Sequence, residues 1–129
     1  MLDVISFMNQ NSNIKQIAPM VPSSDVAGTA EFLTKALGFK SVMVSPVPGY
    51  DVLARDGREI HIVDSEDETP NELSVYINTG DLTALWDHFS SFKDEALSIR
   101  EPFEQPYGMK EFHVILPYTN ALLMIGAEA

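Results

Sequence analysis

The sequence contains no cysteine, which excludes disulfide bonds, thiolate metal sites and cysteine nucleophiles. Basic residues are few, because 8 lysines and arginines stand against 19 acidic residues and give a formal net charge of -11 at pH 7. Such a surface repels nucleic acid phosphates and attracts cationic ligands to any acidic cleft. We therefore expect no nucleic acid partner.

Long hydrophobic runs are also missing, since no stretch approaches the roughly 20 apolar residues that a membrane-spanning helix needs. The first seven residues have no basic region and carry Asp3 inside a short apolar run, which is unlike a secretory signal. A chain without cysteine also suits a reducing compartment. We therefore expect a cytoplasmic protein with no membrane partner.

The hydrophobic residues, 45% of the 129 in the chain, are spread along most of its length, and this distribution predicts one globular domain. Residues 1–16 show no clear period and are interpreted as an N-terminal extension. The domain itself is expected to cover residues 17–129, in two halves that repeat one order of elements.

The first half, about residues 17–64, has the pattern of a βαβββ module. Asp25 is a good N-cap, and the apolar residues that follow predict a helix that ends at Gly38. The Asp56-Gly57 step between two alternating segments predicts a β-hairpin. We expect strands over residues 17–22, 39–45, 50–54 and 58–63.

The second half, about residues 71–126, repeats this order after an acidic connection at residues 65–70. Asp81 caps a predicted helix whose apolar face carries Trp86, which we therefore interpret as a core residue. We expect strands over residues 72–77, 96–101, 109–116 and 121–125, and a loop over 102–108. The predicted fold class is α+β.

Several segments, in this order, resemble the glyoxalase/bleomycin resistance/dioxygenase (vicinal oxygen chelate) superfamily. They are Met20-Val21-Pro22-Ser23-Ser24-Asp25, Leu37-Gly38-Phe39, Gly49-Tyr50-Asp51-Val52-Leu53 and Tyr107-Gly108-Met109-Lys110-Glu111-Phe112. The bleomycin resistance proteins are the most similar members in length, acidity and the proline of the first strand. The resemblance implies two βαβββ modules that form an open curved mixed sheet, and a homodimer with clefts between its subunits.

In that superfamily one divalent metal is usually held by His, Gln or Glu on the first and last strands of each module. Here only His61 occupies such a position, and Met124 stands where a glutamate is usual. A single imidazole is a poor site for a divalent ion. We therefore expect no metal, no cofactor and no catalytic residue, with His113 left open as a second ligand beside His61.

The same resemblance implies a ligand site of six residues: Tyr50, His61, Phe103, Tyr107, Met109 and Met124. Tyr50 and Tyr107 fall where the bleomycin resistance proteins have pocket tryptophans, and Phe103 is a candidate third wall. Tyrosine offers less stacking area but adds a hydroxyl, which favours a smaller or more polar planar ligand. Ordinary packing at strand ends is the alternative reading of both tyrosines.

The function predicted from these observations is a metal-free, non-catalytic protein that sequesters a planar ligand of the bleomycin type. Acidic residues would favour a cationic one; they are Asp51, Glu59, Glu101, Glu104 and Glu111. The first alternative is a metal-dependent lyase or oxidoreductase of the same superfamily, with His61 and Glu111 or His113 at its centre. The second is a protein whose partner is another protein.

Overall fold

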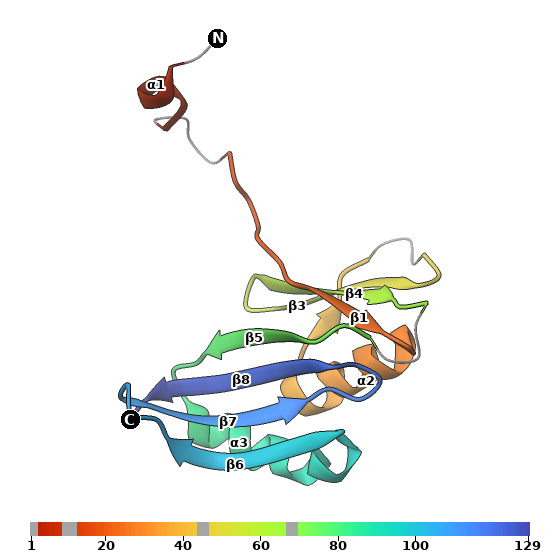
Figure 1. Cartoon of the computed structure of the whole chain (residues 1–129), viewed down its shortest axis with the longest axis vertical. Coiled ribbons are helices and arrows are strands. Elements are labelled where there is room, and N and C mark those ends of the chain that lie inside the picture. The colour runs from red at the N-terminus through yellow and green to blue at the C-terminus, as the bar shows by residue number, and fades with distance from the viewer. Residues whose placement is uncertain (1–2, 9–12, 44–46, 67–69) are drawn as a thin grey trace.

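The computed structural model describes residues 3–8, 13–43, 47–66 and 70–129. Its elements follow the predicted order, with α1 (Val4–Met8) preceding the repeat (Figure 1). The first module contains β1 (Met20–Ser23), α2 (Val26–Leu37), β2 (Lys40–Ser41), β3 (Tyr50–Arg55) and β4 (Arg58–Asp64). The second contains β5 (Leu73–Asn78), α3 (Leu82–Phe89), the 3-10 helix η1 (Ser90–Glu95), β6 (Ser98–Glu104), β7 (Met109–Ile115) and β8 (Ala121–Glu128).

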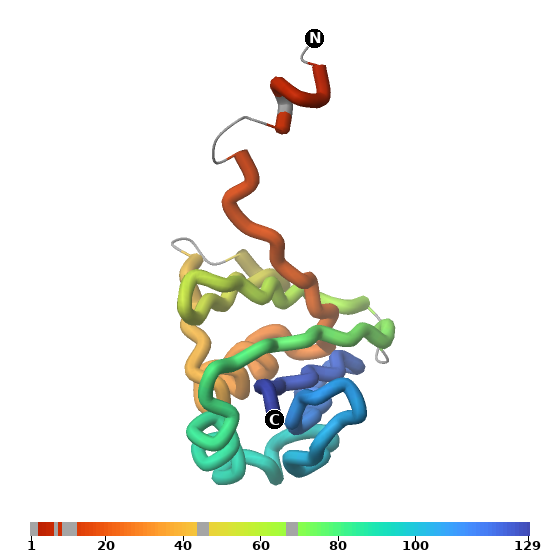
Figure 2. Tube along the Cα trace, turned by 90° about the vertical axis from the view of Figure 1, so that its left-hand side faces the viewer, coloured from red at the N-terminus to blue at the C-terminus, as the bar shows by residue number. Residues whose placement is uncertain are grey.

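Each module forms a four-stranded mixed sheet with the same topology. The strand orders are β1-β4-β3-β2 and β5-β8-β7-β6, and in each sheet the first pair is parallel while the others are antiparallel. Strands β1 and β5 lie next to each other in the middle of the molecule, while α2 and α3 pack together on one side of the sheets (Figures 1 and 2). The predicted α+β fold of two βαβββ modules is confirmed.

The helix boundaries follow the predicted caps. Asp25 accepts a hydrogen bond from the Gly28 N–H at 3.0 Å, and Asp81 accepts one from the Ala84 N–H at 3.0 Å. Gly38 closes α2 in the left-handed conformation at φ 73°. Asp56 and Gly57 both have positive φ, 51° and 75°, as a two-residue turn with the twist of a β-hairpin requires.

Two strand predictions need correction. The strand expected over residues 39–45 is reduced to β2, an edge strand paired only with β3, and residues 44–46 lie outside the described part. The loop expected over residues 102–108 begins later, because β6 continues to Glu104 through a register shift between Arg100 and Phe103. Such an irregularity accommodates Pro102, which has no N–H to donate.

The core lies between the helices and one face of the sheets. Phe32 of α2 and Phe89 of α3 meet edge to face at 5.9 Å between ring centroids, so the two modules share an aromatic contact. Trp86 is partly buried and packs 5.1 Å from Phe112 of β7, as expected of a core residue. No helix in the described ranges is long and apolar enough to cross a membrane.

Candidate ligand-binding site

The face of each sheet that lies opposite the core carries the chemically active side chains. In the first sheet Met20, His61 and Val52 are cross-strand partners, while the neighbouring Ile60 and Ile62 are buried in the core. We call this side the open face of the sheet. Strand alternation places residues two apart on the same face.

The second sheet follows the same rule. Tyr76, Met124 and His113 are aligned across β5, β8 and β7, whereas Phe112 and Val114 belong to the core. Both open faces therefore carry a Glu-apolar-His tripeptide, Glu59 to His61 on β4 and Glu111 to His113 on β7.

His61 is the centre of the first polar group, the His61 cluster of Tyr50, Glu59 and His61. The His61 Nε2 lies 3.0 Å from the Glu59 Oε1, and its Nδ1 shares a hydrogen bond with the Tyr50 hydroxyl. This arrangement fits the tautomer in which Nε2 carries the proton and Nδ1 accepts from the tyrosine. The histidine is thereby oriented through both ring nitrogens.

A buried carboxylate is the centre of the second group, the Glu111 cluster of Tyr76, Gln105, Tyr107, Glu111 and His113. The Glu111 Oε1 receives hydrogen bonds from Tyr107 at 2.8 Å, Gln105 at 2.8 Å and His113 at 2.7 Å. Its Oε2 receives one from Tyr76 at 3.2 Å and lies 2.8 Å from the Tyr107 hydroxyl. Glu111 is 0% exposed, so these donors replace the water that a carboxylate normally binds.

The hydrogen bonds that Glu111 accepts keep its carboxyl group ionised. Burial alone raises the pKa of Glu111 and is the largest single influence, but the donors His113, Gln105, Tyr107 and Tyr76 together outweigh it and lower the pKa. Burial and the contact with Glu111 raise the pKa of Tyr107 to about 12. At neutral pH the cluster therefore holds a carboxylate anion among neutral hydroxyl donors.

Local backbone geometry places these donors. Tyr107 lies in the β6–β7 turn, which is closed by a hydrogen bond from the Gln105 N–H to the Met109 carbonyl at 2.7 Å. The residue is 60% exposed although its hydroxyl donates to Glu111. On β8, a Cβ at Gly126 would lie 2.4 Å from the Tyr76 hydroxyl, so a glycine is needed there for Tyr76 to reach Glu111.

Phe103 lies beside this cluster but already has partners. Its ring centroid is 4.9 Å from that of His113, and the Arg100 guanidinium carbon lies 3.4 Å from the Phe103 centroid. This is a cation–π contact. A ligand that stacked on that face of Phe103 would have to displace Arg100, which leaves Tyr107 as the more accessible aromatic surface.

The six residues predicted as the ligand site are divided between the two sheets. Tyr50 and His61 belong to the first, and the other four belong to the second, where Met124 is the cross-strand partner of His113 and Met109 begins β7. Met109 and Met124 are half-buried and would give the site an adaptable apolar wall.

The donor set does not suit a metal ion. Among the residues described, no group of three or more His, Asp and Glu side chains is placed to hold one. His61 pairs with Glu59 and His113 with Glu111, so each sheet offers one imidazole and one carboxylate. Protein metal sites commonly use three or four such ligands. The suggestion that His113 joins His61 finds no support in this pairing.

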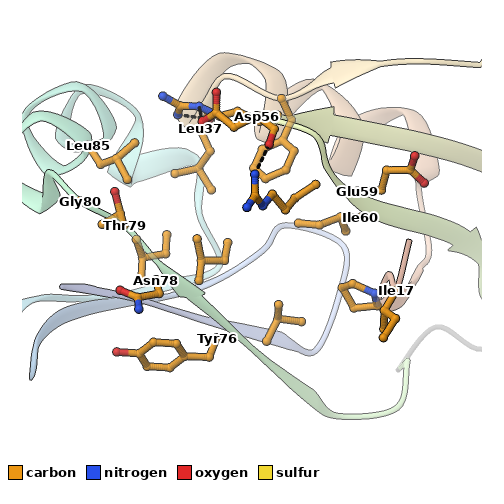
Figure 3. A pocket seen from close by; sticks show the side chains of 17 residues that line it. Ile17, Leu37, Asp56, Glu59, Ile60, Tyr76, Asn78, Thr79, Gly80 and Leu85 are labelled. Carbon is orange, nitrogen blue, oxygen red and sulfur yellow. Dashed lines mark hydrogen bonds and ion pairs between the residues drawn. The ribbon is translucent and has the colours of Figure 1, made fainter. Parts of the chain in front are cut away.

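A separate cavity of about 640 Å³ lies between the two modules (Figure 3). Aliphatic side chains line it from five elements, with Leu37 of α2, Ile60 of β4, Val75 of β5, Leu85 of α3 and Ile125 of β8. We call it the intermodule cavity. Its lining also includes Glu59 and Tyr76, one member of each polar cluster, so it lies beside both rather than containing either.

Sequence reasoning missed several members of the site. Glu111 was considered only as one of several acidic residues or as an alternative base, and Tyr76, Gln105, Arg100 and Gly126 were not singled out. The repeated Glu-apolar-His spacing was the available signal for both clusters. Nothing in the sequence indicates that Tyr76 of β5 reaches Glu111 across the intervening strand β8.

Comparison with solved structures shows the same fold in bleomycin resistance proteins. The bleomycin resistance determinant encoded on transposon Tn5 superposes with a TM-score of 0.74 at 24% identity, covering 89% of this chain and 98% of that one. The bleomycin-binding protein from Streptomyces verticillus, complexed with copper(II)-bleomycin, gives a TM-score of 0.73 at 21% identity, covering 91% and 98%.

A glyoxalase/bleomycin resistance protein/dioxygenase from Nocardioides gives a TM-score of 0.69 at 15% identity, covering 96% of this chain and 89% of that one. No family model matches the sequence, and no curated protein matches it. At these identities the likeness establishes the fold. The resemblance inferred from the sequence is confirmed at that level.

Proposed function

We propose that this protein binds a planar, cationic small molecule of the bleomycin type without converting it, as a cytoplasmic homodimer whose clefts are built on the open faces of the sheets. Two of the similar structures are a bleomycin resistance determinant and a protein complexed with copper(II)-bleomycin. These two proteins suggest bleomycin-type molecules as the ligand class, and the chemistry of the site supports that choice.

The observation that carries the proposal is the buried Glu111 anion beneath the exposed Tyr107 ring. A carboxylate that is kept ionised by neutral donors retains its negative charge for a ligand. A cationic group that approached it would replace one of the hydroxyl donors and gain a charge-assisted hydrogen bond. The Tyr107 ring beside it offers a stacking surface for a planar group.

The net charge of -11 supports the same ligand class, because it raises the local concentration of cations and their association rate. Met109 and Met124 add adaptable apolar contacts on the same sheet. Tyr50 and His61 lie on the other sheet and provide the polar wall of the proposed cleft.

Fluorescence titration with metal-free and copper-loaded bleomycin tests this proposal. We expect saturable quenching in the wild type, weakened about tenfold or more in Tyr107→Ala and in Glu111→Gln. Tyr118→Phe is the matched control, because Tyr118 packs over Gly28 of α2, and it should bind as the wild type does. Equal binding by all four proteins, or no saturable signal, would refute the proposal.

The second candidate is a lyase or oxidoreductase of the same superfamily. The observation that favours it is the Glu–His pair on each open face, which supplies a general base although one pair is too small to hold a metal by itself. A histidine oriented by a carboxylate is a competent proton acceptor. Elemental analysis of chelator-free protein separates the two candidates. A stoichiometric transition metal that is lost in His61→Ala or His113→Ala would favour the enzyme.

A further inference from the structure

His113 of β7 differs from His61 because one of its ring nitrogens is not used within the fold. Both nitrogens of His61 are engaged, one by Glu59 and the other by Tyr50. His113 uses only its Nε2, which lies 2.7 Å from the Glu111 Oε1. Among the described residues its Nδ1 has no hydrogen-bond partner, and no buried side-chain nitrogen or oxygen in that part of the chain lacks one. The Nδ1 atom is therefore accessible from outside the fold.

The buried carboxylate fixes which nitrogen of His113 carries the proton. Glu111 is 0% exposed and accepts hydrogen bonds as an anion, so the His113 Nε2 has to donate to it. In a neutral imidazole the proton on Nε2 leaves a free lone pair on Nδ1. Gln105 and Tyr107 also donate to Glu111 and keep the carboxylate in place. His113 thus presents an unprotonated nitrogen in a fixed orientation.

Neither cross-strand neighbour of His113 occupies this lone pair. The neighbour on β6 is Arg100, whose guanidinium carbon lies over the Phe103 ring, 3.4 Å from its centroid. The neighbour on β8 is Met124, which has no proton to donate. The Phe103 ring also packs edge to face against the imidazole, at 4.9 Å between centroids, and limits its rotation. The lone pair is therefore available to a ligand on the open face of the second sheet.

A histidine whose N–H donates to a carboxylate has the arrangement that metal-ligating histidines adopt in proteins. The carboxylate fixes the tautomer and makes the other nitrogen a better electron-pair donor. One such nitrogen is too few to hold a bare ion, since protein sites commonly use three or four ligands. It is enough to fill one open position of a metal that a small molecule already chelates. Imidazole nitrogen suits copper, zinc, nickel and iron.

The charges around His113 do not select the ligand by themselves. The Arg100 guanidinium and the Glu111 carboxylate flank it and have opposite signs. The negative charge of the whole chain raises the local concentration of any cationic complex, wherever that complex binds. Coordination by Nδ1 is therefore the distinguishing interaction, and a chelate without formal charge should bind too.

We propose that the site on the second sheet receives a transition-metal chelate and that the His113 Nδ1 becomes one ligand of its metal. The nitrogen lone pair replaces a water molecule on the metal, and no proton is released, because Nδ1 carries none. This inference rests on the proposed function, since it adds a metal-bearing group to the ligand class of the same site. The metal arrives and leaves with its chelator, so the protein needs no three-ligand site of its own, and the described residues contain none.

Electron paramagnetic resonance with copper(II) iminodiacetate, an uncharged chelate with open coordination positions, tests the coordination without bleomycin. We expect nitrogen splitting from an imidazole that changes when the histidines are isotopically labelled, and about tenfold weaker binding in His113→Gln. The glutamine amide can still donate to Glu111, and far-UV circular dichroism checks that the variant is folded. His88→Ala is the matched control and should bind as the wild type does, because the His88 Nε2 pairs with the Lys35 carbonyl at 2.7 Å between α3 and α2.

Titration with copper-loaded and metal-free bleomycin separates this inference from the proposed function. The copper-loaded form should bind the wild type about tenfold more tightly than the metal-free form, and the two should bind His113→Gln equally. Equal binding of both forms by the wild type, or a chelate signal that is the same in His113→Gln, would overturn the inference while leaving the proposed function intact. If neither form of bleomycin binds but the chelate signal depends on His113, the coordination stands and the proposed ligand class fails.

Discussion

The two open faces carry the same residue types in opposite arrangements. In the first module His61 is central, held between the Tyr50 hydroxyl and Glu59, whose side chain is 30% exposed. In the second module Glu111 is central and its side chain is 0% exposed, with His113 as one of several donors. The same Glu-apolar-His tripeptide thus forms a partly exposed pair in one sheet and contains a buried anion in the other.

The difference comes from the surrounding chain rather than from the tripeptide. The β6–β7 turn brings Gln105 and Tyr107 over Glu111, and Gly126 leaves room for the Tyr76 hydroxyl. A buried charge is tolerated only where enough donors surround it. We therefore expect substitutions in the Glu111 cluster to affect stability much more than matched substitutions in the His61 cluster.

The largest expected effect is that of Glu111→Gln. Glutamine removes the anion and presents an NH2 group to Tyr76, Tyr107 and Gln105, all of which already donate to this position. We expect the free energy of unfolding at pH 7 to fall by about 2–4 kcal/mol, measured by urea denaturation. The matched change Glu59→Gln should cost less than about 1 kcal/mol, because it removes a partly exposed pair. Equal losses would contradict the contrast between the clusters.

The same cluster predicts a pH dependence of stability. The hydrogen bonds to Glu111 hold its pKa below the ordinary value of 4.5, so the unfolded chain binds this proton more readily than the folded one. The stabilisation from ionised Glu111 is fully present above pH 4.5 and is lost as the pH falls through the lower folded pKa. The gap in unfolding free energy between wild type and Glu111→Gln should therefore narrow below pH 4.5. A gap that is constant from pH 7 to pH 3 would show that folding does not lower the pKa of Glu111.

The sequence predicts some features of the fold well and others poorly. The helix caps Asp25 and Asp81 and the Asp56-Gly57 turn are local signals, and the structure follows them. The full extent of β6 was not predicted, because Pro102 normally ends a strand and only a register shift accommodates it. Local sequence signals thus predict the order of the helices and strands but not every boundary.

The site was predictable only in part for a related reason. Strand alternation shows that Glu111 and His113 share a face, but the burial of Glu111 depends on Tyr76, which is distant in sequence and reaches it across β8. Contacts of this kind depend on strand order and register. The sequence therefore identified the residue types of the site but not which carboxylate would be buried.

Gly126→Ala tests the steric basis of the Glu111 cluster. The new Cβ would lie 2.4 Å from the Tyr76 hydroxyl and 3.1 Å from the Glu111 Cβ, so one of them must move. We expect unfolding to become easier by about 1–3 kcal/mol. In a Tyr76→Phe background the same substitution should cost less, because the closest atom is absent. A double-mutant cycle in urea measures this difference, and strict additivity would show that the hydroxyl is not the obstacle.

The smallest expected effect is that of Tyr107→Phe, which removes one hydroxyl donor and keeps the ring. Gln105, His113 and Tyr76 still donate to Glu111, so the unfolding free energy at pH 7 should fall by less than it does in Glu111→Gln or in Gly126→Ala. The folded pKa of Tyr107 is raised from 10.0 to about 12, so this stabilisation is complete below pH 10 and is lost as the pH rises towards 12.

Alkaline titration of tyrosine absorbance measures the same contact directly. In the wild type we expect a component of the tyrosinate absorbance to appear near pH 12, from Tyr107. Burial and the contact with Glu111 raise the pKa of Tyr76 too, so the amplitude of the high-pH component should fall in Tyr107→Phe without vanishing. It should stay unchanged in Tyr118→Phe, because Tyr118 packs over Gly28 on a different part of the molecule. If the amplitude did not fall in Tyr107→Phe, the exposed residue would not be tied to Glu111, and the asymmetry between the two modules would depend on Tyr76, Gln105 and His113 alone.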